Sequence, residues 1–156
     1  MKKKEEKILE KYKKIFVEEF EGPNLDEAIK MAISSLRMTK DELKIKVLFE
    51  GEPGLFGLAG SKPAKIKVMP KTDKLENLIK YFVIKLLDFI KEKISFTEVK
   101  IEDKRVEIKV LVEDDDVLKN LFAKNLQQSV SLLLESFVKK INPEFEINLK
   151  FQKLNR

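Results

Sequence analysis

Residues 50–68 read EGEPGLFGLAGSKPAKIKV. This stretch holds four of the chain's five glycines, spaced by three: Gly51, Gly54, Gly57 and Gly60. Three apolar residues lie between them: Leu55, Phe56 and Leu58. Because glycine adopts the positive φ angles that turns require, the stretch predicts a long turn between two strands. Two roles stay open for the apolar side chains, which either fold back over the sheet as a plug or project as an exposed apolar knob.

A projecting knob is a surface that a protein partner would cover, with Lys62 at its rim. The candidate partner-binding loop therefore consists of these residues: Gly54, Leu55, Phe56, Gly57, Leu58, Gly60 and Lys62. A phosphate-binding loop is disfavoured, because the stretch leads into Pro63 and a strand instead of a helix N-terminus, and no GK[ST] follows.

On the N-terminal side of the loop, the pattern predicts a strand, a helix and a second strand. Residues 15–22 form the first strand, which Gly22-Pro23 ends. Asn24 and Glu27 predict a capping box for a helix that runs to Leu36, and Thr39 with Glu42 repeats the cap signature. The apolar residues of the next two strands alternate: Leu43, Ile45, Val47 and Phe49, then Ala64, Ile66 and Val68. The order over residues 15–70 is β-α-β-β.

The second half predicts the order α-β-β-α-α-β over residues 73–152. Its first helix carries apolar residues at helical spacing: Leu75, Leu78, Ile79, Phe82, Leu86, Phe89 and Ile90. Two strands joined through Asp103-Lys104 follow, then a short helix, a break near residues 123–125, and a second helix. The predicted inner face of that second helix is Val130, Leu133, Phe137, Val138 and Ile141. A final alternating strand follows Asn142-Pro143. The fold class is therefore α+β with two small domains.

Composition disfavours an enzyme. The 156 residues include no cysteine and no histidine, which removes the thiolate nucleophile, the commonest general base and the commonest metal ligands. We expect no catalytic residue, no metal, no cofactor and no small-molecule substrate. The acidic run at residues 113–116 lacks the spacing of a calcium loop, and we assign it to the N-terminus of a helix, whose dipole attracts carboxylates.

Residues 1–14 form a charged leader with seven basic and three acidic residues, so they hold most of the net charge of +5. Ile8, Tyr12 and Ile15 or Phe16 recur at helical spacing there. We expect a short solvated helix or a frayed arm, since the apolar stripe is too narrow for firm membrane anchoring. No signal peptide or membrane span is predicted, and we interpret the protein as cytoplasmic.

The first half resembles the N-terminal domain of the Jag family, also called KhpB, EloR or SpoIIIJ-associated. The resemblance is carried by LDEAIKMA at residues 25–32 and by GLFGLAGSKPAKI at residues 54–66. It implies that a type II K-homology (KH) domain follows, that the protein binds single-stranded RNA, and that it acts in cell-envelope growth and division. It also implies a KH-only protein partner or self-association, and contacts with envelope-associated proteins.

KH domains hold RNA at a GXXG loop, but this chain has no glycine after Gly60. The break between the two helices carries Ala123, Lys124, Asn125 and Leu126 instead. The candidate RNA-binding residues around it are Lys119, Lys124, Asn125, Gln127 and Gln128. The family's C-terminal single-strand-binding domain is expected to be absent. Two functions stay open: an RNA-associated regulator, or a protein-interaction and dimerisation module whose KH-like domain has lost RNA binding.

Overall fold

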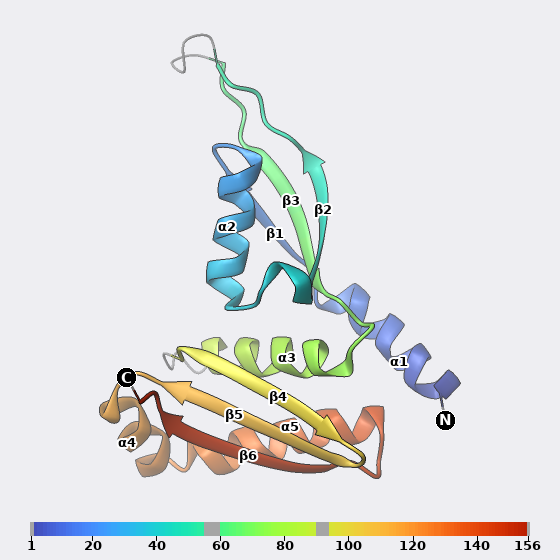
Figure 1. Ribbon diagram of the computed structural model, residues 1–156, viewed down its shortest axis with the longest axis vertical. Coiled ribbons are helices and arrows are strands. Elements are labelled where there is room, and N and C mark those ends of the chain that lie inside the picture. The colour runs from blue at the N-terminus through green and yellow to red at the C-terminus, as the bar shows by residue number, and fades with distance from the viewer. Residues whose placement is uncertain (1, 55–59, 90–93, 156) are drawn as a thin grey trace. The chain divides into compact units, whose positions relative to one another are not determined.

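A computed structural model describes residues 2–54, 60–89 and 94–155. The chain divides into two compact units, one of residues 10–73 and the other of residues 1–9 with 74–156. Each unit contains one three-stranded sheet, and helices account for most of the rest (Figure 1). The predicted α+β class and both predicted element orders are confirmed. The predicted domain ranges, 15–70 and 73–152, stay proposals.

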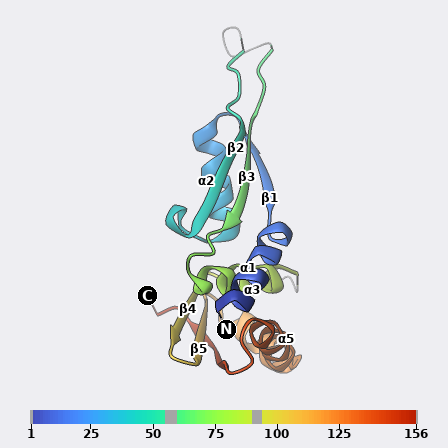
Figure 2. The same ribbon diagram turned by 90° about the vertical axis from the view of Figure 1, so that its right-hand side faces the viewer.

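The unit of residues 10–73 is an antiparallel sheet with one helix. Its elements are β1 (Glu18–Gly22), α2 (Leu25–Leu36), the single 3-10 turn η1 (Lys40–Glu42), β2 (Leu43–Phe49) and β3 (Ala64–Pro70). β3 is the central strand and pairs antiparallel with both β1 and β2. In Figures 1 and 2, α2 lies along one side of this sheet.

Two local features fix α2 against the sheet. Asn24 caps the helix, since its side-chain oxygen accepts a hydrogen bond of 2.9 Å from the backbone N–H of Glu27. Gly22, the last residue of β1, lies so close to α2 that a Cβ there would be 2.5 Å from the backbone nitrogen of Ala28. Only glycine allows this approach.

The core of this unit lies between α2 and one face of β3. The alternation of β3 is confirmed: Ala64, Ile66 and Val68 are buried, and so are Ala28, Ala32 and Leu36 of α2. The start of β1 differs from the prediction, because the preceding helix continues to Ile15 and the strand begins only at Glu18.

The predicted alternation of β2 is wrong beyond Ile45. A bulge lies between Val47 and Phe49, where the register against β3 shifts, and it brings Phe49 opposite Lys65. Lys65 is exposed on the side of the sheet away from α2, so Phe49 lies on that side too. Val47 and Leu48 are 41% and 43% exposed, which leaves Leu43 as the only fully buried residue of β2.

The segment that follows β2 and the segment that precedes β3 remain paired at one further position. Glu52 and Lys62 exchange two backbone hydrogen bonds of 2.9 Å, and their side chains form an ion pair of 3.5 Å. Gly51 precedes this pair with φ of 89°, and a Cβ there would lie 3.0 Å from the backbone nitrogen of Ala64. The glycine is therefore required both by the turn and by the close approach of β3.

The unit of residues 1–9 and 74–156 has a mixed sheet. Its elements are α3 (Leu75–Phe89), β4 (Phe96–Glu102), β5 (Arg105–Val112), α4 (Asp115–Ala123), α5 (Leu126–Ile141) and β6 (Glu146–Lys153). β5 is central, antiparallel to β4 and parallel to β6. Asp103, at the β4–β5 turn, has φ of 54°, a conformation that aspartate tolerates better than most residues. In Figure 2, α3 and α5 lie on the same side of β4 and β5.

The core of this sheet is the inner face of β5 together with α3 and α5. The buried residues of β5 alternate: Val106, Ile108, Val110 and Val112. The predicted face of α5 needs one correction, because Leu134 is buried and Leu133 is 51% exposed. The buried face of α3 ends before the last residues of the predicted apolar stripe, because Phe89 is 84% exposed. Val83, Ile84 and Leu87, which the predicted stripe did not include, are buried. Helical spacing alone did not distinguish these neighbouring apolar positions.

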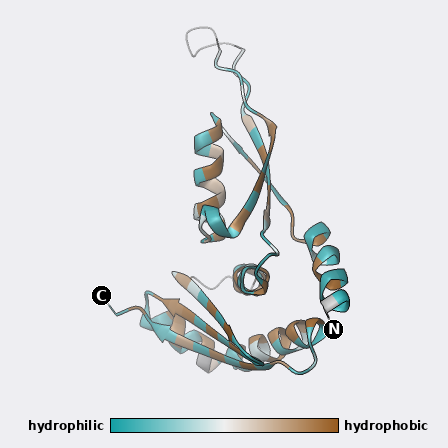
Figure 3. Ribbon diagram, turned by 45° about the vertical axis from the view of Figure 1, so that its right-hand side comes forward, coloured by the Kyte–Doolittle hydropathy of each residue, from teal (hydrophilic) through white to brown (hydrophobic). Residues whose placement is uncertain are grey.

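The leader forms a helix, α1 (Lys2–Ile15). In Figure 3 this helix is mostly coloured as hydrophilic, whereas the strands alternate between hydrophobic and hydrophilic residues. Within the second unit, the Asn142 amide donates a hydrogen bond of 3.2 Å to the Glu5 carboxylate. Within the first, the rings of Tyr12 and Phe16 stack with centroids 5.4 Å apart. The leader is therefore helical, and its solvation stays a prediction.

Candidate nucleic-acid interface

The junction between α4 and α5 is a sharp turn at Lys124 and Asn125. Asn125 takes the left-handed conformation, with φ of 51° and ψ of 23°. The N–H of Lys124 still donates to the carbonyl of Asn120, and the N–H of Ser129 donates to the carbonyl of Asn125. One helix therefore ends and the next begins within two residues. Asparagine is the non-glycine residue that tolerates this conformation well, which explains how the turn forms without glycine.

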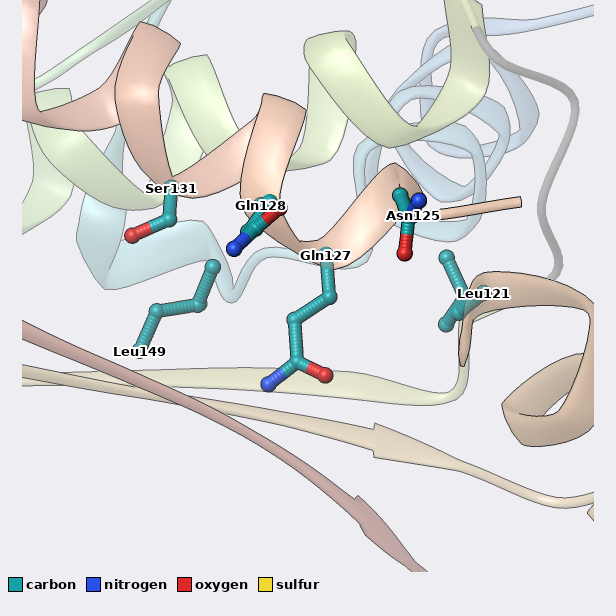
Figure 4. Close-up of a pocket in the computed structure, with 6 residues that line it drawn as sticks. All are labelled: Leu121, Asn125, Gln127, Gln128, Ser131 and Leu149. Carbon is teal, nitrogen blue, oxygen red and sulfur yellow. The ribbon is translucent and has the colours of Figure 1, made fainter. Parts of the chain in front are cut away.

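An open pocket of about 220 Å³ adjoins this turn. Its lining residues come from α4, the start of α5 and β6: Leu121, Asn125, Gln127, Gln128, Ser131 and Leu149. We name it the α4–α5 pocket. Figure 4 shows Asn125, Gln127 and Gln128 gathered at the start of α5, with Leu121 on one side and Leu149 on the other.

The lining of the α4–α5 pocket combines three amides and a hydroxyl with two leucines. Each amide carries both donors and acceptors, and the serine hydroxyl adds one of each. Such groups bind the edges of nucleobases, while apolar side chains contact base faces. The pocket therefore has the chemistry to hold an unpaired base.

Three of the five candidate RNA-binding residues line the pocket, and the two lysines do not. Lys119 is exposed on α4 and forms an ion pair of 3.8 Å with Asp116, one turn earlier. Lys124 is exposed at the turn itself. Sequence patterns missed Leu121, Ser131 and Leu149, because a pocket lined by three separate elements leaves no spacing signal in the chain.

The acidic run before α4 has structural partners. The Asp114 carboxylate accepts a hydrogen bond of 2.8 Å from the backbone N–H of Asp116. The Asp115 carboxylate accepts one of 2.7 Å from the Lys153 ammonium, and this bond holds the pKa of Asp115 below its ordinary value of 3.8. Both contacts agree with the interpretation of the run as a helix start.

The candidate partner-binding loop is described only in part. Leu55, Phe56, Gly57 and Leu58 lie outside the described residues. Gly54 is half-buried, and Lys62 is exposed beside Glu52. Gly60 has φ of 76°, and a Cβ added there would meet no atom of the described residues within 4 Å. Whether the loop is a plug or a knob stays a prediction.

A comparison with protein families identifies a match that includes the first sheet. Residues 20–70 match the family model described as Jag N-terminus. Over this segment the chain is similar to a Jag N-terminal domain. The RNA-binding protein KhpB of Bacillus subtilis (strain 168) is 40% identical over 55 residues, which make up 35% of this chain and 26% of KhpB. The predicted resemblance is thereby confirmed over about a third of the chain. The matched segment, called the Jag N-terminal domain below, contains the end of β1 together with α2, β2 and β3.

The α4–α5 pocket lies outside residues 20–70, the segment that matches the Jag N-terminus model. In the part of the chain that the structure describes, no helix is both long and apolar enough to cross a bilayer.

Proposed function

We propose that this protein is a non-enzymatic, cytoplasmic regulator of the Jag type that binds single-stranded RNA and acts in cell-envelope growth and division. The observation that carries the proposal is the presence of Asn125, Gln127 and Gln128 together in the α4–α5 pocket. Two further facts support it: KhpB is an RNA-binding protein, and residues 75–153 have the α-β-β-α-α-β order of a type II KH domain.

In this proposal, the KH-like unit holds RNA without glycines. A GXXG loop lets phosphates approach the backbone amides, and the side chains at this turn keep them at a distance. The amides of Gln127 and Gln128 take over by binding base edges, and the exposed Lys124 ammonium contacts a phosphate. Affinity would therefore depend less on salt than in a protein with many phosphate contacts.

The experiment is a fluorescence-anisotropy titration of single-stranded RNA against the full chain between about 50 mM and about 200 mM salt. Lys124→Ala should weaken binding and flatten the slope of log K against log salt by about 0.7, the value for one phosphate contact on a single strand. Lys139→Ala is the matched control, because Lys139 lies near the other end of α5, is exposed, and already pairs with Glu135 at 2.6 Å.

Gln128→Ala should weaken binding several-fold without changing the salt slope, because an amide contact to a base releases no counterion. The absence of saturable binding by the unmodified chain at low salt contradicts the proposal. Binding that neither the Lys124 nor the Gln128 variant alters places the RNA elsewhere on the protein.

The second candidate function is a protein-interaction and dimerisation module. It is favoured by two adjacent exposed leucines on α5, Leu132 at 67% and Leu133 at 51% exposure. Exposed apolar neighbours of this kind often mark an interface. If the chain self-associates through them, Leu132→Lys should convert a dimer into a monomer in sedimentation velocity. A monomeric unmodified chain at all concentrations contradicts this candidate.

A further inference from the structure

The side of the first sheet that faces away from α2 carries an unusual set of residues. The cross-strand register places them on one surface: Lys44, Lys46 and Phe49 of β2, and Lys65 and Lys67 of β3. We name this surface the lysine face. All four of its lysines are exposed or half-buried, and Phe49 is half-buried.

The lysine face contains an unfavourable pairing. Lys46 and Lys67 lie directly opposite each other on neighbouring strands, where like charges are destabilising. Carboxylates of β1, the third strand of the sheet, offset only part of the repulsion between the lysines. Glu19 lies 3.8 Å from the Lys67 ammonium, and Glu21 lies 2.8 Å from that of Lys65. The structure shows no ion pair between Lys46 and another described residue, so β2 is the basic edge of this face.

Lys44 extends the basic edge toward α1. The carboxylate of Glu10 accepts a hydrogen bond from Lys13, which lowers the pKa of Glu10, and the charge of Lys44 makes a smaller contribution in the same direction. Lys44 is therefore near one carboxylate, whereas Lys46, in the middle of the face, is opposite a second lysine.

The bulge in β2 adds an aromatic ring to this surface. Without it, strict alternation would place Phe49 beside Ile45 and Val47, on the side of α2. With it, Phe49 lies opposite Lys65 and in the same strand as Lys46. The bulge moves Phe49 out of the core and onto a basic surface, so the protein buries less apolar area. A binding role for the ring of Phe49 would account for this loss of burial.

Lysines and an aromatic ring on an exposed sheet surface match the requirements of one ligand. Single-stranded nucleic acid offers phosphates to cations and base faces to aromatic rings, and sheet surfaces that combine the two are used for this purpose. We propose that the lysine face of the Jag N-terminal domain binds single-stranded RNA, with Phe49 stacking on a base and Lys46 and Lys67 contacting phosphates.

This inference rests on the proposed RNA association of the protein but assigns a second, separate surface to it. The test uses the full chain and a labelled oligouridine of about 12 nucleotides, long enough for one such surface. Lys46→Gln should weaken binding and lower the salt slope by about 0.7. Lys30→Gln is the matched control, because Lys30 is exposed on α2, on the other side of the sheet, and should leave the slope unchanged.

Two further variants test whether the ring of Phe49 contributes to binding and whether a carboxylate on this face weakens binding. Phe49→Leu keeps an apolar side chain but removes the stacking platform, and it should weaken binding about fivefold or more. Glu19→Gln removes the carboxylate next to Lys67 and should strengthen binding. Thermal unfolding of each variant checks that it is folded at the titration temperature.

A titration with an oligodeoxythymidine of the same length tests whether the contacts are to phosphates and base faces or to the 2′-hydroxyl of RNA. Phosphates and base faces are present in both DNA and RNA, so the three variants should alter the binding of both nucleic acids alike. Effects confined to RNA overturn this assignment of contacts, because they require the 2′-hydroxyl.

The outcomes separate this inference from the proposed function. If Lys46→Gln and Phe49→Leu both leave affinity and salt slope unchanged while Gln128→Ala weakens binding, the lysine face is not a site and the α4–α5 pocket is. If only the first two variants weaken binding, the lysine face is the site and the proposed pocket fails. No saturable binding by the unmodified chain overturns both.

Discussion

The ring of Phe82 on α3 stacks on the ring of Phe137 on α5, with centroids 4.1 Å apart and planes 8° apart. This contact joins two helices that are distant in the chain and lie on the same side of the second sheet. Phe137 is 5% exposed. Phe137→Ala should therefore lower the free energy of unfolding by about 3–5 kcal/mol, measured by urea denaturation. Leu132→Ala, at an exposed position of the same helix, should change it by less than about 0.5 kcal/mol. Equal effects would contradict the assigned core.

Gly22 and Gly60 should respond differently to the same substitution. Gly22→Ala places a methyl group within 2.8 Å of two backbone atoms of Ala28, and backbone cannot move aside as a side chain can. We expect a loss of about 3 kcal/mol or more. The methyl group of Gly60→Ala meets no atom of the described residues within 4 Å, so the strain of φ at 76° remains and we expect a loss of about 1 kcal/mol. Thermal or urea unfolding measures both, and a similar loss at the two positions would contradict the close packing of β1 on α2.

The Asn24 cap should contribute about 1 kcal/mol to stability. Asn24→Ala removes the acceptor for the N–H of Glu27 and leaves that donor without a partner from the protein. Asn24→Asp keeps an acceptor at the same position and should retain most of the stability. A loss shared by both variants would show that the amide nitrogen, and not the oxygen, stabilises this end of α2.

The left-handed turn at Asn125 should favour glycine and reject a β-branched residue. Asn125→Gly should leave stability unchanged or raise it slightly, since glycine adopts φ of 51° without strain. Asn125→Val should cost about 1–2 kcal/mol. The free energy of unfolding measures both, and a destabilised glycine variant would show that the asparagine side chain itself holds the turn.

The ion pair between Asp115 and Lys153 should be visible in an acid titration. Lys153 lowers the pKa of Asp115, so the contact stabilises the folded protein above the unfolded pKa and is lost as pH falls through the depressed value. Removing the lysine by Lys153→Gln should raise the pKa of Asp115 toward its ordinary value of 3.8. Carbon-13 NMR of the carboxyl group measures this directly. An unchanged pKa would mean that the pair does not persist in solution.

Much of the fold was predictable because each element has a strong local signal. Asn24 and Glu27 identify the start of α2, and the alternating apolar residues of β3 and β5 identify strands with one buried face. The order α-β-β-α-α-β followed from such signals alone. The predictions failed where two apolar residues are adjacent. Leu133 and Leu134 both fit the helical period, and only the packing of α5 against its sheet decides which is buried.

The candidate sites were predictable only in part, for a different reason. Asn125, Gln127 and Gln128 stood out because they lie at or next to the position of the missing glycine loop. Leu149, in contrast, reaches the same pocket from a strand that follows the whole of α5. The lysine face was not predicted either. The place of Phe49 on it depends on a bulge between Val47 and Phe49, and nothing in the alternation of β2 shows that one residue is extra.

The parallel pairing of β5 with β6 has a consequence for the order of folding. The turn at Asp103 closes the β4–β5 hairpin locally. Arg105 of β5, in contrast, pairs with Glu146 of β6, about 40 positions along the chain. This parallel pairing forms only after α4 and α5 have formed the crossover between the two strands. We expect the hairpin and its packing on α3 to be present in the transition state and β6 to join after it. Destabilising changes in β6 should then accelerate unfolding and leave the refolding rate nearly unchanged, while changes at the β4–β5 turn slow refolding.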